Sequence, residues 1–172
     1  MDDAVDTDFP IFIVTGTSGA GKTAVIPELR RLLPGVAVLD KDHMWHPNPG
    51  AAYDNFFRIA AALATTGIYT VIVGTIIPEH FTGWACEERD RVGEIRYVNL
   101  HCSDGVRERR LRARPAWRKS STPEFIEEHR KLAARLLAGE LPAGTPTFDT
   151  TKCSVEETAA EVASYIRAAM AG

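Results

Sequence analysis

Residues 16 to 23 read GTSGAGKT, and this octapeptide limits the possible folds more than any other part of the chain. It matches the pattern G-x-x-x-x-G-K-[ST], and it follows an apolar run and precedes a stretch with helical spacing. Glycines in such a loop let successive backbone N–H groups turn inward around phosphate oxygens, and the N-terminus of the following helix adds partial positive charge. The motif therefore predicts a phosphate-binding P-loop between a strand and a helix.

The positions of this loop have different predicted roles. Lys22 is expected to reach the β and γ phosphates of a nucleotide, and the hydroxyl of Thr23 is expected to ligate magnesium. A glycine-rich turn without a ligand is the alternative, and the placement between a strand and a helix disfavours it. The predicted nucleotide contacts in the loop are Gly16, Thr17, Ser18, Gly19, Ala20, Gly21, Lys22 and Thr23.

Apolar runs alternate with helical stretches along the chain, a pattern typical of an α/β domain with a parallel sheet. Strands are predicted at 9–15, 36–40, 70–75, 95–101 and 147–149. Helices are predicted at 22–33 with a kink at Pro27, and at 51–66, 80–91, 103–114, 121–138 and 154–170. The last two helices begin at S-x-x-E sequences, which predict capping boxes at Ser121 and Ser154.

Together with the P-loop, this alternation predicts a three-layer α/β/α P-loop NTPase fold with a five-stranded parallel sheet and a helical lid. No linker divides the chain, so we expect one domain over residues 1–172. Residues 1–8 are expected to form a flexible tail, and residues 115–122 are expected to form the lid segment between two helices.

The composition excludes several classes of protein. With 45% hydrophobic residues and 172 residues in all, the chain can build a sizeable core. A net charge of -3 and a pI near 6.0 do not favour nucleic acid as a partner. No apolar stretch approaches the roughly 20 residues that span a bilayer, and the start of the chain is acidic, so a cytoplasmic protein without membrane contact is expected. Neither a disulfide framework nor a zinc site is indicated by the three cysteines, Cys86, Cys102 and Cys153.

A second cluster of polar residues, DKDHMWHP at 40–47, follows the second predicted strand. The carboxyl ends of the strands in an open α/β sheet face the ligand crevice. Two carboxylates at Asp40 and Asp42 can divide the work there, one tied to magnesium and one within reach of an acceptor hydroxyl. A helix cap or a solvated turn is the alternative reading of this cluster.

The P-loop followed by VLDKD at 38–42 resembles the small-molecule kinase branch of P-loop proteins, which includes shikimate kinase, gluconate kinase and chloramphenicol phosphotransferase. The resemblance implies that Asp40 is the residue on the metal side and that Asp42 is the candidate base. His46 and Pro47 are also similar to gluconate kinase, but the other sugar-acid contacts of that family are not evident, so its substrate is not carried over.

An arginine-rich segment, VRERRLRAR at 106–114, is similar to the R-x-x-x-R lid segment of these kinases. By that resemblance Arg110 packs near the adenine, and Arg114 closes onto the phosphates as charge develops between donor and acceptor. Arg118 is a third candidate of this kind. The remaining arginines of the segment are predicted to lie on a solvated helix face, namely Arg107, Arg109 and Arg112.

Two further stretches nominate residues for the base and the acceptor. The sequence FDTT at 148–151 resembles the D-T-[ST] turn that borders the adenine in several family members, so the backbone of Thr150 is a candidate contact of the base. The sequence TIIPEHF at 75–81 is similar to a stretch of tunicamycin-resistance P-loop proteins. The predicted substrate contacts are Asp42, Trp45, Arg58 and Glu79, whereas Trp84 is expected to pack in the core.

These residues predict an ATP-dependent phosphotransferase that uses Mg²⁺ and has Lys22, Asp42 and Arg114 as catalytic residues. The expected acceptor is a hydroxyl of a small metabolite or antibiotic, because arginines are few between residues 40 and 91. A nucleoside or nucleotide kinase and a non-catalytic ATP-binding sensor stay open as alternatives, and the chain is expected to be a monomer or homodimer. Motor ATPases are disfavoured because the third strand does not end in Asp, and GTPases because no N-K-x-D sequence occurs.

Overall fold

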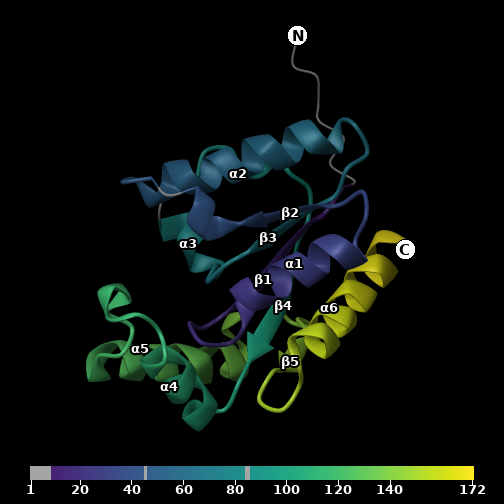
Figure 1. The fold of residues 1–172 in the computed structure, drawn as a ribbon. Helices are drawn as coiled ribbons and strands as arrows, with labels where there is room; N and C mark the ends of the chain where they lie inside the picture. Colours follow the sequence, from purple (N-terminus) through teal and green to yellow (C-terminus); the bar gives the residue numbers. More distant parts are fainter. Residues whose placement is uncertain (1–8, 45, 84–85) are drawn as a thin grey trace.

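A computed structural model of the chain describes residues 9–44, 46–83 and 86–172. Within these residues a parallel sheet of five strands has the order β2-β3-β1-β4-β5 (Figure 1). The strands are β1 (Ile11–Gly16), β2 (Ala37–Asp40), β3 (Thr70–Val73), β4 (Ile95–His101) and β5 (Thr147–Asp149). Because β1 is central, the loop that follows it opens at the middle of the carboxyl edge of the sheet.

Helices cover both faces of the sheet, which confirms the three-layer architecture predicted from the sequence (Figure 1). Helices α1 (Lys22–Leu32) and α6 (Val155–Met170) pack together on one face, and α2 (Pro49–Ala64) covers the other. A short α3 (Glu79–Gly83) follows β3. Helices α4 (Asp104–Arg112) and α5 (Pro123–Arg135) lie beyond the carboxyl end of β4 (Figure 1).

The two faces of β1 belong to two separate clusters of buried residues. Phe12 and Val14 pack with side chains of α1 and α6, and Ile11 and Ile13 pack with side chains of α2. Leu136, just after α5, joins the second cluster. Burial on both faces explains why β1 is a continuous apolar run in the sequence.

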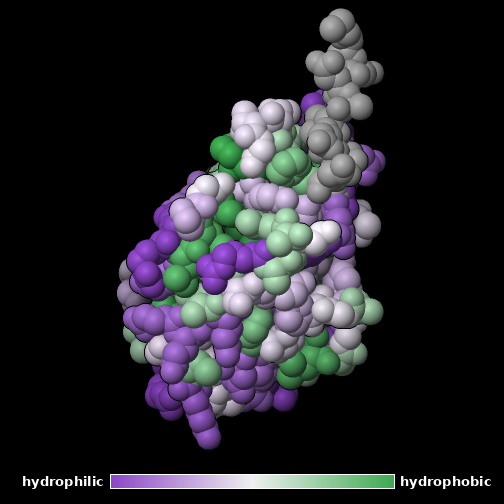
Figure 2. Space-filling view, turned by 90° about the vertical axis from the view of Figure 1, so that its right-hand side faces the viewer, coloured by the Kyte–Doolittle hydropathy of each residue, from purple (hydrophilic) through white to green (hydrophobic). Residues whose placement is uncertain are grey.

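The surface, unlike the core, is mostly polar. Hydrophilic and weakly polar residues cover most of the face shown in Figure 2, and the strongly hydrophobic ones form small separate groups on it. No helix in the described ranges is both long enough and apolar enough to cross a membrane.

The capping box predicted at Ser154 is confirmed. The Ser154 hydroxyl accepts a hydrogen bond from the Glu157 N–H (3.1 Å), and the Glu157 carboxylate accepts one from the Ser154 N–H (2.8 Å). The box predicted at Ser121 is wrong, because Thr122 is the N-cap of α5 and bonds the Phe125 N–H (3.3 Å). Pro123 takes the first helical position, where its fixed φ is favourable and its missing N–H costs nothing.

The structure also differs from the predictions for the helix at 80–91 and for the kink at Pro27. The helix predicted over 80–91 is wrong, since α3 ends at Gly83 and a separate 3₁₀ turn covers Arg89–Arg91. The intervening backbone is tied to α2, because the Glu88 N–H donates to the Asp54 carboxylate (3.0 Å). At Pro27 the first helix is not interrupted, and α1 runs through it to Leu32.

Candidate active site

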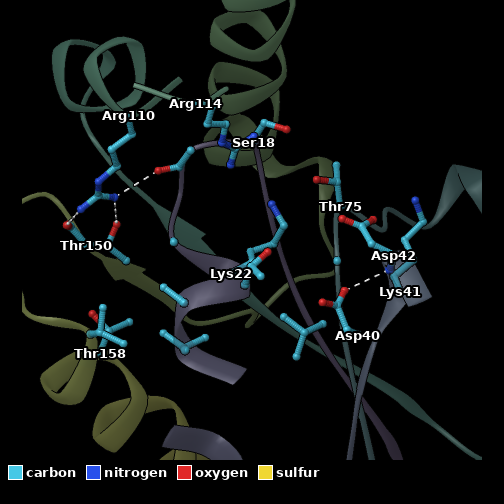
Figure 3. A pocket seen from close by; sticks show the side chains of 18 of the residues that line it. Ser18, Lys22, Asp40, Lys41, Asp42, Thr75, Arg110, Arg114, Thr150 and Thr158 are labelled. Atoms are coloured by element: carbon cyan, nitrogen blue, oxygen red, sulfur yellow. Dashed lines mark hydrogen bonds between the residues drawn. The ribbon is translucent and has the colours of Figure 1, made fainter. Parts of the chain in front are cut away.

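A cavity of about 720 Å³ lies at the carboxyl edge of the sheet. Its walls come from the P-loop, from α1, from the turn after β2, from the residues after β3, from α4 and α5, and from the β5–α6 connection. Figure 3 shows Lys22 in the middle of this cavity, with Arg110 and Thr150 on one side and Asp40 and Asp42 on the other. The structure therefore brings both predicted clusters, the P-loop and the two carboxylates, into one site.

Two glycines give the P-loop its shape. Gly16 has φ +139°, and a Cβ there would lie 2.3 Å from the carbonyl oxygen of Leu100 on β4. Gly19 has φ +85°, and a Cβ there would lie 3.1 Å from Cγ of Arg107 on α4. Both φ values are strained for any other residue, and a Cβ at Gly16 would also collide with the backbone of β4, whereas a Cβ at Gly19 would make a tight contact with Arg107.

Lys22 begins α1, and its ammonium group is held by the loop itself. Nζ donates to the carbonyl oxygens of Gly16 (2.8 Å) and Thr17 (2.7 Å). Burial, together with the positive charge of Arg114, lowers the pKa of Lys22 to about 7, and the Asp42 carboxylate opposes this change. The described residues that line the cavity include five Lys or Arg side chains and two carboxylates, and this positive excess is expected of a site for a polyanion.

The backbone of the loop also contacts α5. The Ser18 N–H donates to Nδ1 of His129 at 3.3 Å, and the imidazole packs on the Phe125 ring with centroids 4.4 Å apart. Burial lowers the pKa of His129 to about 4, with Lys22 the next largest cause, so the ring is neutral near pH 7. His129 lines the cavity, yet nothing in the sequence marked it, since it lies outside every motif.

The two carboxylates come from the end of β2 and the 3₁₀ turn that follows it. Asp40 is the last residue of β2, and its carboxylate accepts a hydrogen bond from the Asp42 N–H (3.0 Å). The same carboxylate lies 4.0 Å from Nε2 of His43. Asp42 is exposed to the cavity beside Thr75, whose hydroxyl donates to the Gly16 carbonyl (2.9 Å). The Asp40 side chain thus caps the turn that presents Asp42.

Arg110 joins the P-loop to the β5–α6 connection. Its Nη1 donates to the Gly19 carbonyl (3.1 Å) and to the Thr150 hydroxyl (3.0 Å), and its Nη2 donates to the Thr150 carbonyl (2.9 Å), as Figure 3 shows in part. The Thr150 hydroxyl in turn donates to the Ala20 carbonyl (3.0 Å). The Thr150 N–H donates to His101, so both backbone groups of Thr150 have protein partners, and the contact with adenine stays a prediction.

The other two arginines predicted for the lid belong to the segment that follows α4. Arg114 and Arg118 both line the cavity, and burial lowers the pKa of Arg114, as does the neighbouring Arg118 charge. The segment between α4 and α5 contains a 3₁₀ turn at Ala116–Arg118, in which Trp117 is 74% exposed. Closure of these side chains over a ligand stays a prediction.

The other arginines of α4 do not share one environment. Arg109 and Arg112 are exposed, as predicted, but the prediction of a solvated Arg107 is wrong, since this side chain is 1% exposed. Arg107 lies one helical turn before the buried Leu111, so both are on the face of α4 that packs inward.

The structure does not bring the predicted acceptor residues together. Arg58 pairs with Glu88 (3.0 Å) and Glu79 pairs with Arg135 (3.4 Å), and neither Arg58 nor Glu79 lines the cavity. Trp45 and Trp84 lie outside the described residues. The cavity that Asp42 lines is also lined by Lys41, Thr75, Arg118, Phe125 and His129.

The residues present fit a magnesium nucleotide. The glycine loop offers backbone N–H groups to phosphate oxygens, and Lys22 supplies a positive charge beside them. Thr23 and Asp40, which both line the cavity, are oxygen donors of the kind that Mg²⁺ prefers. The volume lies within the range of about 300–1,000 Å³ that is usual for small-molecule sites.

Solved structures that share this fold include kinases and a resistance protein. The tunicamycin resistance protein of Deinococcus radiodurans has a TM-score of 0.65 and 19% sequence identity, with 92% of this chain and 95% of that chain covered. Shikimate kinase from Acinetobacter baumannii in complex with shikimate has a TM-score of 0.54 and 18% identity, with 95% and 96% covered. A gluconokinase from Sinorhizobium meliloti 1021 has a TM-score of 0.55 and 18% identity, with 93% and 97% covered.

Neither a protein-family model nor a curated protein matches the sequence. The likeness to the solved structures is therefore one of fold, and at this level it confirms the resemblance to P-loop kinases expected from the sequence.

Proposed function

We propose that this protein transfers the γ-phosphoryl group of ATP to a hydroxyl group of a small molecule. The observation that carries the proposal is the presence of the P-loop lysine and of Asp42 in one cavity. A loop for a triphosphate requires Lys22 and the amides around it, and a hydroxyl acceptor requires a carboxylate on the opposite wall. Asp42 and Asp40 provide that wall.

Each residue has a distinct part in this reaction. The P-loop amides and Lys22 bind the β and γ phosphates, and Arg114 stabilises the charge that spreads over the transferred group. Asp42 orients the acceptor hydroxyl and takes its proton as the new oxygen–phosphorus bond forms and the bond to the β-phosphate oxygen breaks. Thr23 and Asp40 would hold Mg²⁺, which neutralises phosphate charge when it is bound.

The surroundings of Asp42 support a small acceptor. Phe125 gives the cavity an apolar lining residue, and Lys41 and Arg118 add positive charge to the same cavity. Solved structures that share the fold include proteins named as shikimate kinase and gluconokinase, so small alcohols are the first acceptors to test.

A magnesium-dependent assay of ADP release across a panel of small alcohols, sugars, nucleosides and antibiotics tests this proposal. We expect an acceptor-stimulated rate in the wild type that falls by about a hundredfold or more in Asp42→Ala, because a positioned general base contributes about 10²–10⁴ to a rate. Nucleotide binding should survive that change. If both proteins bound ATP equally and no acceptor of a broad panel were phosphorylated, the sensor function would be favoured instead.

A further inference from the structure

Arg107 is the largest fully buried side chain in the described part of the chain. It lies on α4, is 1% exposed, and does not line the cavity. Burying a guanidinium is costly unless its hydrogen bonds and charge are compensated. The contacts of Arg107 therefore show which groups compensate its burial and what role the buried charge could have.

Three contacts satisfy the guanidinium, and one of them is with the P-loop. Nε donates to the hydroxyl of Thr17 (3.0 Å), which is itself 1% exposed. Nη2 donates to the Cys102 carbonyl (2.7 Å), just after β4. Nη1 pairs with Asp104, whose side chain is 60% exposed. The one carboxylate partner is thus largely in water, where solvent screens its charge.

The stem of Arg107 also fits against the loop. A Cβ on Gly19 would lie 3.1 Å from Cγ of Arg107, so the loop backbone packs directly on this side chain. One turn further along α4, Arg110 donates to the Gly19 carbonyl (3.1 Å). Two arginines of one helix thus hold the first half of the P-loop, Arg107 from outside the cavity and Arg110 from its wall.

The positive charge of Arg107 reaches the cavity. Arg107 is among the causes that lower the pKa of His129, which lines the cavity and bonds the Ser18 N–H. Lys22 and Arg114 act on His129 in the same direction, and Glu128 opposes them. Arg107 is therefore part of the positive field around the loop even though it touches no ligand space.

A purely structural role explains these contacts less well. A buried ion pair is often no more stabilising than apolar side chains of similar volume, so a methionine in this place would serve packing at least as well. What an apolar residue cannot do is donate to Thr17 or contribute charge beneath a phosphate site.

We propose that Arg107 is a positioning residue of the nucleotide site, which sets the conformation of the P-loop through Thr17 and adds a buried positive charge to the field that receives the phosphates. This inference rests on the proposed function, because it assumes that the loop binds the phosphates of ATP.

Titration calorimetry with a magnesium complex of a nonhydrolysable ATP analogue, and with inorganic tripolyphosphate, tests the proposal. Arg107→Met should bind both probes about tenfold more weakly or worse, while its melting temperature stays within a few degrees of the wild type. Arg107→Lys should recover part of the loss, because it restores the charge but not the fork of donors. The matched control is Arg112→Met, which removes the same charge from an exposed position of the same helix, and it should bind as the wild type does.

Thr17→Val separates the contact from the charge. It keeps Arg107 and the shape of residue 17 but removes the hydroxyl that accepts from Nε, and it should weaken binding of both probes severalfold. This variant also decides the matter if Arg107→Met does not fold.

Wild-type affinity in folded Arg107→Met, an equal loss in Arg112→Met, or wild-type affinity in Thr17→Val would each overturn the proposal. A wild-type chain that bound neither probe would instead refute the proposed function, so the two failures can be told apart.

Discussion

Removal of the His129 imidazole should strengthen nucleotide binding. In the structure the Ser18 N–H donates to Nδ1 of His129, whereas a P-loop amide is needed for a phosphate oxygen when a nucleotide is bound. The nucleotide must therefore break this hydrogen bond. A neutral intramolecular hydrogen bond is worth about 1 kcal/mol net, so His129→Ala should bind a magnesium nucleotide about fivefold more tightly.

The comparison can be made at constant charge. Because the pKa of His129 is lowered to about 4, the imidazole is neutral at pH 7, and its replacement by alanine or asparagine changes no charge there. His129→Asn is the matched control, since its Oδ1 lies at about the position of Nδ1 and can still accept from Ser18. It should bind the nucleotide with nearly wild-type affinity.

Calorimetry with the nonhydrolysable ATP analogue at pH 7 gives the dissociation constants of the three proteins. Adenosine provides a second probe, because it lacks phosphates and its affinity should be the same in all three. Weaker nucleotide binding by His129→Ala would refute the reasoning, since it would mean that the ring contributes to the bound state. Equal binding by the alanine variant and the wild type would also refute it.

Three further predictions concern the loop and acid stability. Lys22→Ala should lower turnover by about a hundredfold or more at saturating nucleotide, because a positioned charge beside the phosphates is lost, and an unchanged rate of ADP release would remove the proposed site. Gly16→Ala should lower the free energy of unfolding, measured by urea denaturation, by about 2 kcal/mol or more, because its Cβ would lie 2.3 Å from the Leu100 carbonyl oxygen. Gly35→Ala is the control, since Gly35 has φ +80° but no atom within 4 Å of the added Cβ, and it should lower this free energy less. Equal losses in the two variants would contradict the predicted collision. The free energy of unfolding should fall as the pH decreases from 7 to 4, because His129 has a pKa of about 4 in the folded state against 6.5 ordinarily, so the unfolded chain takes up the proton first. This fall should be smaller in His129→Asn. An identical pH profile of the two proteins would argue against the lowered pKa of His129.

The parts of the structure that local chemistry determines could be predicted from the sequence. The P-loop between β1 and α1, the capping box at Ser154 and the approach of Asp40 and Asp42 to the loop follow from glycines, caps and strand ends. Asp40 and Asp42 could be expected near the loop because the carboxyl ends of parallel strands all lie at one edge of the sheet.

The parts that depend on distant packing could not be predicted in this way. Arg107 looked like one more solvated arginine because its burial depends on α4 lying against Thr17, a residue 90 positions earlier. His129 was missed for the same reason, since its partner Ser18 is 111 positions away. Arg58 lies on α2 with a carboxylate of Glu88 within reach, and a sequence does not reveal such a pairing between separate segments.

The hydrogen bond from Thr150 to the Ala20 carbonyl has a consequence for synthesis and folding. It closes a span of 130 residues, so the loop obtains this support only after the last strand has docked beside β4. A chain still emerging from the ribosome, or one cut before Thr150, lacks that support. It also lacks the Thr150 hydroxyl and carbonyl groups to which Arg110 donates. Capture of ATP would then report that the whole polypeptide has reached its native state, and added nucleotide would select completed molecules over partly folded ones.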